Sequence, residues 1–130
     1  MERCQESSLD SRENFYILPF MNMSSALKKL TRTMKVLSDA NRIRILKFLQ
    51  HRSGMCVCEL TAMLQISQPT VSKHLRLLEE SGFVESSKDG LWVNYNLARH
   101  PENPFAAAML RELSVWLEEE PETKEELARA

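Results

Sequence analysis

Apolar residues recur every three or four positions along most of the chain, which is the spacing of amphipathic helices. The first such stripe begins at Ser24 and consists of Leu27, Leu30, Met34 and Leu37. Asp39 or Ser38 then provides an N-cap for a second helix that runs to about His51. The core face of this second helix is formed by Ile43, Ile45, Leu46, Phe48 and Leu49. The pattern therefore predicts two successive helices in the first part of the chain.

A short helix, a tight turn and a longer helix are predicted next. The short helix covers about 58–64, and residues 65–67 form the turn. Ser67 caps the longer helix, and Pro69 lies in its first turn, where a missing N–H costs nothing. Val71, Leu75 and Leu78 have the spacing of a buried face, and Gly82 ends the helix. This arrangement is the geometry that places one helix in the major groove of DNA.

A β-hairpin and a last helix complete the predicted order. Asp89 and Gly90 lie between two β-prone runs, 83–87 and 91–97, which is a strong hairpin signal. A further amphipathic stripe follows residues 100–104 and consists of Phe105, Met109, Leu113, Trp116 and Leu117. The fold class predicted is mainly α with a small β-hairpin, a winged helix–turn–helix.

With 130 residues, the chain is long enough for one compact domain with a modest core. Residues 24–119 are expected to form that domain, after an N-terminal arm at 1–23 and before an acidic tail at 120–130. Met21 and Met23 are alternative translation starts, which would make the arm an upstream extension. No apolar run approaches the length of a membrane span, and no secretion signal is present. We therefore expect a cytoplasmic protein without a membrane partner.

The charge is distributed unevenly, although the net charge is only −1. Residues 24–52 carry eight Lys or Arg and one Asp, which gives +7. Residues 110–130 carry seven Glu against three Lys or Arg, which gives −4. A basic region within a nearly neutral chain can bind a polyanion such as DNA.

Polar side chains are predicted on the outward face of the longer helix of the helix–turn–helix. Gln pairs with adenine and Arg with guanine, whereas Ser, Thr and Lys hold phosphates. Lys88 is expected at the tip of the hairpin, near the DNA backbone. The predicted DNA-binding residues are Ser67, Gln68, Thr70, Ser72, Lys73, His74, Arg76 and Lys88. A solvated helix face is the alternative interpretation of the same residues.

The apolar stripes of the first and last helices are longer than one small core needs. We interpret them as a homodimer interface, because a two-fold dimer would bind two half-sites about 34 Å apart. The predicted interface residues are Leu27, Leu30, Met34, Phe105, Met109, Leu113 and Trp116. The alternative is that both helices only cover the core of a single chain.

Cys56 and Cys58 are the candidate metal ligands. Residues two apart point about 200° apart within a regular helix, so the pair can share a ligand only at a frayed or extended helix start. Free N–H groups at a helix start also favour thiolates, and thiolates select soft ions. Taken alone, two cysteines are also compatible with buried structural thiols.

Four ordered motifs resemble the ArsR/SmtB family of winged-helix, metal-responsive bacterial repressors, and most closely its arsenical-resistance branch. They lie at residues 37–46, 56–60, 67–75 and 88–95, and read LSDANRIRIL, CVCEL, SQPTVSKHL and KDGLWVNY. The resemblance implies a homodimer that binds double-stranded operator DNA without a cofactor. It further implies release when trivalent arsenic or antimony binds the thiolates of Cys56 and Cys58.

The candidate metal ligands differ at one position from those of the arsenical-resistance branch. Arsenical sensors of this type commonly carry a third cysteine where this chain has Thr61. Related cadmium and lead sensors use cysteines of an N-terminal arm, and Cys4 is the candidate for that part here. Cadmium or lead sensing, a redox switch of the same fold, and a protein-binding winged helix are the alternatives. No acid/base pair, phosphate loop or catalytic triad is present, so an enzyme is not expected.

Overall fold

The computed structural model describes residues 24–118, so the predicted arm at 1–23 and tail at 120–130 lie outside the described residues. The chain divides into two compact units, residues 1–31 and 32–130. Helix α3 (Ser25–Val36) is the first described element, and Ser24 caps its start by accepting the Leu27 N–H at 3.2 Å. Among the described residues, none of the helices combines the length and apolarity needed to cross a membrane.

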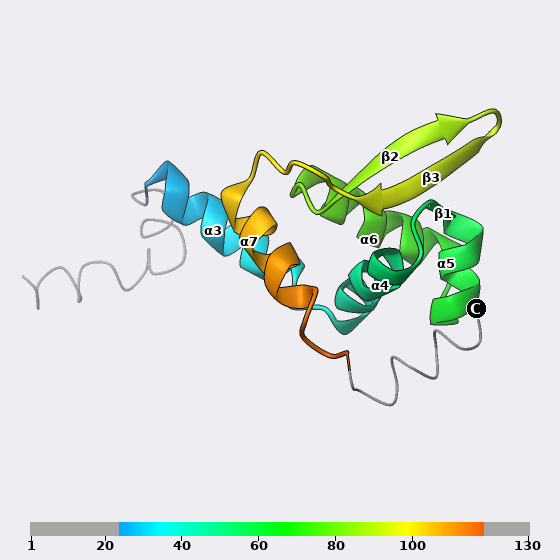
Figure 1. Cartoon of the computed structure of the whole chain (residues 1–130), viewed down its shortest axis with the longest axis horizontal. Coiled ribbons are helices and arrows are strands. Elements are labelled where there is room, and N and C mark those ends of the chain that lie inside the picture. The colour runs from blue at the N-terminus through cyan, green and yellow to red at the C-terminus, as the bar shows by residue number, and fades with distance from the viewer. Residues whose placement is uncertain (1–23, 119–130) are drawn as a thin grey trace, which may run out of the picture. The chain divides into compact units, whose positions relative to one another are not determined.

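Three helices of the second unit follow the predicted order closely. Helix α4 (Ala40–His51) has as its N-cap Asp39, one of the two predicted candidates, and the Asp39 carboxylate accepts the N–H groups of Asn41 and Arg42. Helix α5 (Val57–Leu64) and helix α6 (Gln68–Glu80) are joined by a tight turn with Gln65 in the left-handed conformation. Figure 1 shows α4, α5 and α6 grouped below the hairpin.

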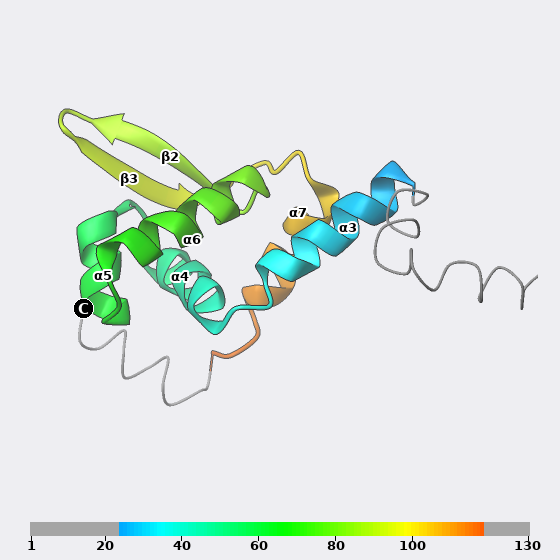
Figure 2. The same ribbon diagram turned by 180° about the vertical axis from the view of Figure 1, so that it is seen from behind.

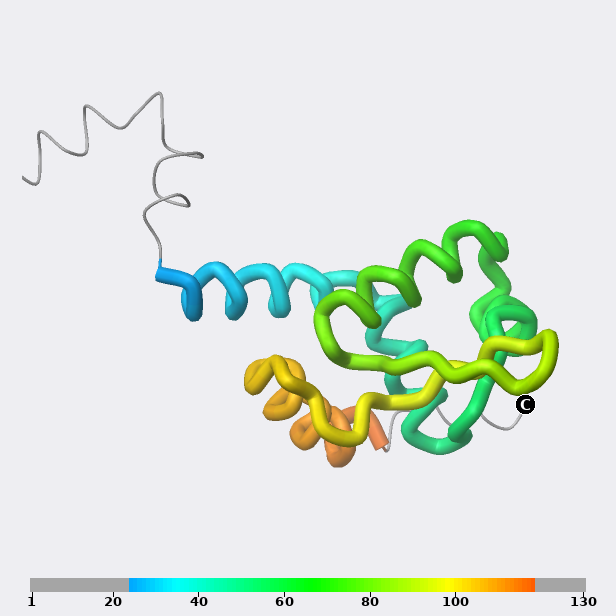
Figure 3. Tube along the Cα trace, turned by 90° about the horizontal axis from the view of Figure 1, so that it is seen from above, coloured from blue at the N-terminus to red at the C-terminus, as the bar shows by residue number. Residues whose placement is uncertain are grey.

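The sheet has three strands rather than the two that the sequence predicts. Strands β2 (Val84–Asp89) and β3 (Trp92–Leu97) form the predicted hairpin. A third strand, β1 (Met55–Cys56), pairs antiparallel with β3, so the order is β1-β3-β2. Two residues are too few to show an alternating pattern, and β1 was therefore missed. Figure 3 traces the hairpin from above as part of the tube along the chain.

A single apolar core fills the space between α4, α5, α6 and the base of the hairpin. Ile45, Leu60, Val71 and Phe83 are completely buried at its centre. The predicted face of α6 is confirmed, since Val71, Leu75 and Leu78 are all buried. Helix α6 contacts β2, α4 and α5, and Figure 2 shows it from behind, beside the hairpin. The core thus holds the helix–turn–helix and the hairpin in one body.

Helix α7 (Pro104–Leu113) begins at Asn103, a residue with no predicted role. The side-chain oxygen of Asn103 accepts the N–H groups of Phe105 and Ala106. Its amide donates to Thr33 Oγ1 at 2.8 Å and to the Ser81 carbonyl at 2.9 Å. Asn103 therefore joins the end of α3, the end of α6 and the start of α7.

The last helix ends earlier than its apolar stripe indicates. Helix α7 stops at Leu113, and residues 114–118 continue as turns in which Leu117 has a positive φ of 65°. The buried Lys47 of α4 explains this ending, because its amino group donates to the carbonyls of Leu113 and Trp116 at 2.7 and 2.6 Å. Carbonyls at a helix end lack intrahelical partners, and an amino group satisfies them.

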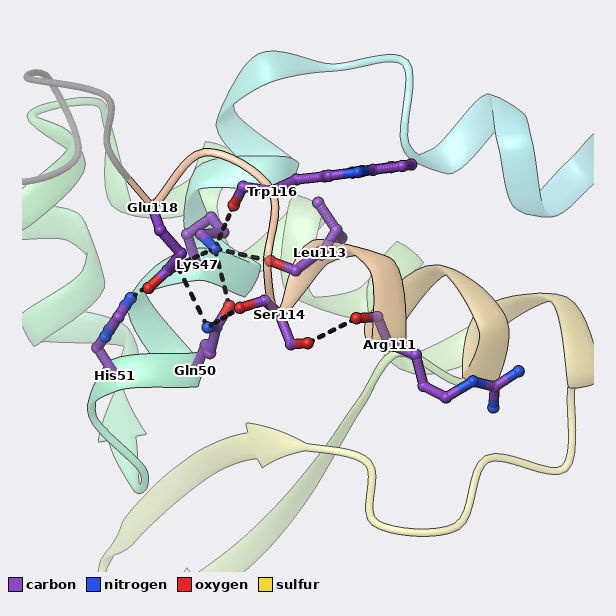
Figure 4. Close-up of polar contacts among 8 residues, drawn as sticks. All are labelled: Lys47, Gln50, His51, Arg111, Leu113, Ser114, Trp116 and Glu118. Carbon is purple, nitrogen blue, oxygen red and sulfur yellow. Dashed lines mark hydrogen bonds and ion pairs between the residues drawn. The ribbon is translucent and has the colours of Figure 1, made fainter.

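A carboxylate completes the cluster around Lys47, which Figure 4 shows in close-up. Glu118 pairs with the Lys47 amino group and accepts from Gln50 and His51, each at 3.3 Å. Hydrogen bonding from Lys47 lowers the pKa of Glu118. The C-terminal half of α4 is thereby fastened to the segment that follows α7.

Candidate nucleic-acid interface and thiol site

Helix α6 presents five of its predicted DNA-binding side chains to solvent. They are Gln68, Thr70, Ser72, Lys73 and Arg76, and all are exposed. The apolar residues on the other side of α6 are buried in the core, which fixes the direction in which the polar face points. The arrangement allows amide, hydroxyl and cationic groups to approach a nucleic acid together.

The start of α6 is held in a defined conformation by its cap. Ser67 accepts the Thr70 N–H at 3.4 Å, and the two hydroxyls are 2.7 Å apart. Pro69 follows in the first turn, as predicted. A capped helix start with exposed polar residues has N–H groups that favour a phosphate.

His74 is the one residue of the predicted reading face that points inward. Its exposed fraction is 8%, and its ring lies against Arg42 of α4, with 3.1 Å between Nη1 and Nδ1. The prediction of an outward His74 was therefore wrong in position. His74 falls three residues after Val71 and one before Leu75, so it shares the buried side of the helix.

The hairpin carries Lys88 near its tip, exposed as predicted. Gly90 has a positive φ of 65° and makes the turn between the strands. Leu91 and Trp92 lie beside it with exposed fractions of 99% and 61%. Trp92 lies opposite Asp89 at the tip of the hairpin.

The basic region at 24–52 is not one continuous surface. Lys47 is buried beneath the end of α7, and Arg42 is directed toward Val36 and His74. Arg52 pairs with Glu59 at 2.8 Å. Arg42, Lys47 and Arg52 thus have partners within the protein, which a count of charges along the sequence cannot show.

Cys56 and Cys58 lie on either side of the point where β1 becomes α5. Cys56 is the last residue of β1 and the N-cap of α5, in an extended conformation with φ −90° and ψ 169°. Cys58 lies in the first turn of α5. Both thiols are free; Cys58 is exposed and Cys56 is half-buried. The geometry is the extended helix start that the sequence requires for a shared ligand.

Glu59 closes the first turn of α5. Its carboxylate accepts the backbone N–H of Cys56 at 3.1 Å and a hydrogen bond from Arg52. The Cys56 N–H lowers the pKa of Glu59, and Arg52 lowers it further. Sequence reasoning did not single out Glu59, although Glu three residues after an N-cap is a known capping signal.

The thiol site is also fastened to the hairpin. Gly54 has a positive φ of 73°, and its N–H donates to the Asn96 side chain at 2.7 Å. Met55 and Cys56 are paired with Tyr95 and Asn94 of β3. Residues 54–56 and strand β3, which are distant in sequence, are thus joined next to the cysteines.

The two thiols are suited to a soft metal ion, but the described residues provide no third ligand beside them. Among residues 24–118, no three His, Cys, Asp or Glu side chains are grouped to hold a metal ion. Thr61 occupies the position of a third cysteine, and its hydroxyl is buried without a hydrogen-bond partner in the described residues. A hydroxyl is a hard donor and does not replace a thiolate. Cys4, the predicted third ligand, lies outside the described residues.

The predicted dimer residues differ in how much surface they leave open. Met34 and Trp116 are exposed at 41% and 47%, whereas Phe105 and Met109 are half-buried. Leu113 is buried in the core at 5%, so little of its side chain remains for a partner. Leu27 and Leu30 lie in the other compact unit, on the first turns of α3.

These elements define a winged helix–turn–helix protein with a pair of thiols at the start of α5, the helix that precedes α6. Comparison with known proteins agrees with this class. Residues 39–86 match the family described as "Bacterial regulatory protein, arsR family". The chain belongs to this family, whose members are transcriptional regulators, and the expectation that it is not an enzyme is confirmed.

Several relatives are named for resistance to toxic elements. The "Arsenical resistance operon repressor" of Escherichia coli is 44% identical over 66 residues, 51% of this chain and 56% of that protein. The protein of the same name in Bacillus subtilis is 32% identical over 57% of this chain and 70% of its own length. The cadmium resistance regulator CadC of Listeria innocua is 43% identical over 47% of this chain. The chain thus spans little more than half of the E. coli and Listeria proteins.

A solved structure confirms the fold. HlyU from Vibrio cholerae superimposes with a TM-score of 0.57 and 28% sequence identity. The match covers 70% of this chain and 94% of the HlyU chain. The predicted fold class, mainly α with a winged helix–turn–helix, is therefore correct.

Proposed function

We propose that this protein is a metalloid-responsive transcriptional repressor. It binds operator DNA as a homodimer through α6 and the hairpin, and it is released when trivalent arsenic or antimony binds Cys56 and Cys58. Family membership supports the regulatory part of this proposal, and the arsenical-resistance names of the E. coli and B. subtilis relatives support the choice of inducer.

The observation that carries the proposal is the position of the two free thiols. Cys56 lies in an extended N-cap and Cys58 in the following turn, one short helix away from the reading helix. Helices α5 and α6 contact each other, and β1 pairs with the wing strand β3. An ion that draws both sulfurs together therefore acts on a junction that adjoins both DNA-contacting elements.

The choice of ion follows from the ligand count. Two thiolates with Cys4 as a third ligand suit the three-coordinate chemistry of arsenic or antimony. A site with four sulfurs for cadmium would lack one ligand. The CadC relative is the specific observation that favours the alternative, a cadmium- or lead-responsive repressor built on the same fold.

The dimer is supported by apolar surface that the described part of one chain leaves open. Met34 and Trp116 are both exposed, and each lies in a stripe predicted from spacing alone. Large apolar side chains on a surface commonly mark an interface with another protein. A second copy of the chain is the occupant that a DNA-binding protein with two half-sites requires.

Fluorescence anisotropy tests the proposal directly. The reduced protein is titrated onto a labelled fragment of its own promoter, and arsenite is then added. We expect binding, followed by release at an arsenite concentration close to that of the protein. Binding without release would leave a repressor but contradict the metalloid assignment, and the same titration with cadmium and lead would then identify the ion.

A double variant isolates the thiols. Cys56→Ser with Cys58→Ser is expected to bind the fragment as wild type does and to remain bound when arsenite is added. Thr61→Ala is the matched control, because it changes a neighbouring side chain of α5 that is not a thiol. Cys4→Ser measures whether the third ligand contributes. Normal release by the double variant would refute the assignment of the site.

A further inference from the structure

Two sequence motifs that lie 32 residues apart meet beneath the reading helix. Asp39 and Arg42 come from the start of α4, and His74 comes from the inner side of α6. His74 is nine-tenths buried, whereas its neighbours Lys73 and Arg76 are exposed. The proposed function assigns no role to a buried histidine on α6. The contacts of His74 therefore require a separate explanation.

The contacts of Arg42 determine the protonation state of His74. The guanidinium nitrogen Nη1 of Arg42 is 3.1 Å from His74 Nδ1. Arginine only donates hydrogen bonds, so Nδ1 must accept and the ring proton lies on Nε2. The pairing thus selects neutral His74 in one tautomer.

The same guanidinium connects three helices. Arg42 Nε donates to the carbonyl of Val36, the last residue of α3. Its backbone lies in the first turn of α4, where Asp39 accepts the Arg42 N–H at 3.3 Å. Through Nη1 it reaches α6. The end of α3, the start of α4 and the middle of α6 are therefore held by one side chain.

Burial opposes the protonation of His74, and the charges around the ring act in both directions. Burial lowers the pKa of His74, and the cations Arg42 and Lys73 lower it further, whereas Asp39 raises it. The Asp39 carboxylate is 4.0 Å from Nε2, which is longer than a hydrogen bond. If Nδ1 of His74 were protonated, it would become a donor that faces the donating guanidinium of Arg42. The hydrogen bond between the two side chains would then be lost.

We propose that Arg42 and His74 are positioning residues for DNA reading. Neutral His74 accepts a hydrogen bond from Arg42 and so fixes α6 relative to Val36 and to the start of α4. Protonation of His74 in mild acid breaks this hydrogen bond. The proposal rests on the proposed function, because it assumes that α6 reads the operator. Its consequence is that base discrimination depends on pH through one buried ring.

Recognition of DNA bases is sensitive to the position of α6. A bidentate contact requires two hydrogen bonds of about 2.7–3.2 Å at once, whereas a phosphate contact tolerates displacement. Gln68, Ser72 and Arg76 belong to the same rigid helix as His74, so a shift of α6 moves all three. Loss of the hydrogen bond is therefore expected to reduce specific binding more than non-specific binding.

Folding stability should follow the same titration. The pKa of His74 in the folded chain lies below the ordinary value of 6.5, so the unfolded chain takes up the proton first. Stability is then fully present above about pH 6.5 and declines as the pH falls through the folded-state pKa. The decline marks the range in which DNA discrimination should fail.

Nuclear magnetic resonance of the ring nitrogens tests the network without DNA. We expect the His74 shifts to report a proton on Nε2 and none on Nδ1 at pH 7.5. The pKa of His74 should lie below the ordinary histidine value of 6.5. A proton on Nδ1 at pH 7.5, or a His74 pKa at or above 6.5, would overturn the proposal.

Operator discrimination supplies the functional readout. The ratio of affinity for the operator to affinity for unrelated DNA removes general charge effects, and it is measured from pH 7.5 to 5.5. For wild type we expect a loss of about tenfold, the scale of one charge-assisted hydrogen bond. His74→Asn retains a neutral acceptor as far from Cα as Nδ1, so its ratio should stay constant. His100→Asn, the control, should behave as wild type.

The outcomes separate this proposal from the proposed function. If the wild-type protein does not prefer its operator at any pH, the proposed function is refuted. The nitrogen chemical shifts of His74 then still test the hydrogen bond between Arg42 and His74. Equal pH profiles for wild type and His74→Asn refute the positioning role. Arg42→Lys keeps the charge but cannot bridge Val36 and His74, and we expect it to lose discrimination already at pH 7.5. Unchanged discrimination would overturn the proposal even if His74→Asn fails to fold.

Discussion

The side-chain amide of Asn103 forms hydrogen bonds through both its oxygen and its nitrogen. Its oxygen caps α7, and its nitrogen joins the hydroxyl of Thr33 to the carbonyl of Ser81. Gly82 lies against it, since a Cβ at Gly82 would be 3.4 Å from the Asn103 Cβ. The positive φ of Gly82, 87°, also favours glycine at this position. The pair defines where α6 ends and α7 begins.

Two substitutions at Asn103 separate these contributions. Asn103→Asp retains the cap but removes the two donors, whereas Asn103→Ala removes both functions. We expect the alanine variant to lose about 2–3 kcal/mol of unfolding free energy and the aspartate variant less. Urea unfolding followed by circular dichroism measures the difference. Equal losses would show that the cap contributes nothing.

Residue types alone predict the caps but not the partners of internal polar groups. Asp39 and Ser67 cap their helices as predicted, because a cap is a local feature that depends on a few neighbouring residues. His74 was predicted on the exposed side of α6, because the spacing of apolar residues does not show whether a polar residue at the edge of the apolar face is buried. Its partner Arg42 is distant in the sequence, and no local pattern identifies such a contact.

At the level of elements, the ending of α7 is set by a residue of another helix. Lys47 lies on α4, is 2% exposed, and donates to the carbonyls of Leu113 and Trp116. The apolar stripe predicted a longer helix because Trp116 and Leu117 continue its spacing. A buried amino group that accepts no hydrogen bonds draws the last carbonyls toward itself, and the chain turns at that point.

Lys47→Met tests this control of the last helix. Methionine fills a similar volume but leaves two carbonyls without a donor, so we expect a loss of roughly 2 kcal/mol in unfolding free energy. Hydrogen exchange should become faster at residues 114–118 and remain slow in α6. Lys88→Met on the exposed hairpin is the control and should cost little. Unchanged exchange after Lys47→Met would refute the role of Lys47.

The third strand is the element that changes the interpretation of the site most. The sequence predicts a thiol pair at a helix start, and the structure adds that Cys56 is paired with Asn94 of the hairpin. The order of the helices follows from periodicity, and the presence of the hairpin follows from the Asp89-Gly90 signal. The turn itself lies one residue later than that signal, since Asp89 pairs with Trp92 across Gly90 and Leu91. A strand of two residues carries no periodicity and exists only because β3 lies beside it.

At the level of the whole molecule, the proposed mechanism is a coupling between a thiol site and a DNA surface. The fold joins the two sites twice, through the packing of α5 on α6 and through the pairing of β1 with β3. Couplings of this kind usually amount to about 1–3 kcal/mol, or roughly 5–150-fold in affinity. By thermodynamic linkage the effect must be the same in both directions.

Reciprocity provides the most direct measurement of the central claim. Arsenite affinity of the reduced protein is determined by calorimetry, first free and then saturated with operator DNA. We predict weaker arsenite binding in the presence of operator, by the same factor by which arsenite weakens operator binding. Equal arsenite affinity with and without operator would contradict the account, because an ion that does not distinguish the two states cannot release the DNA.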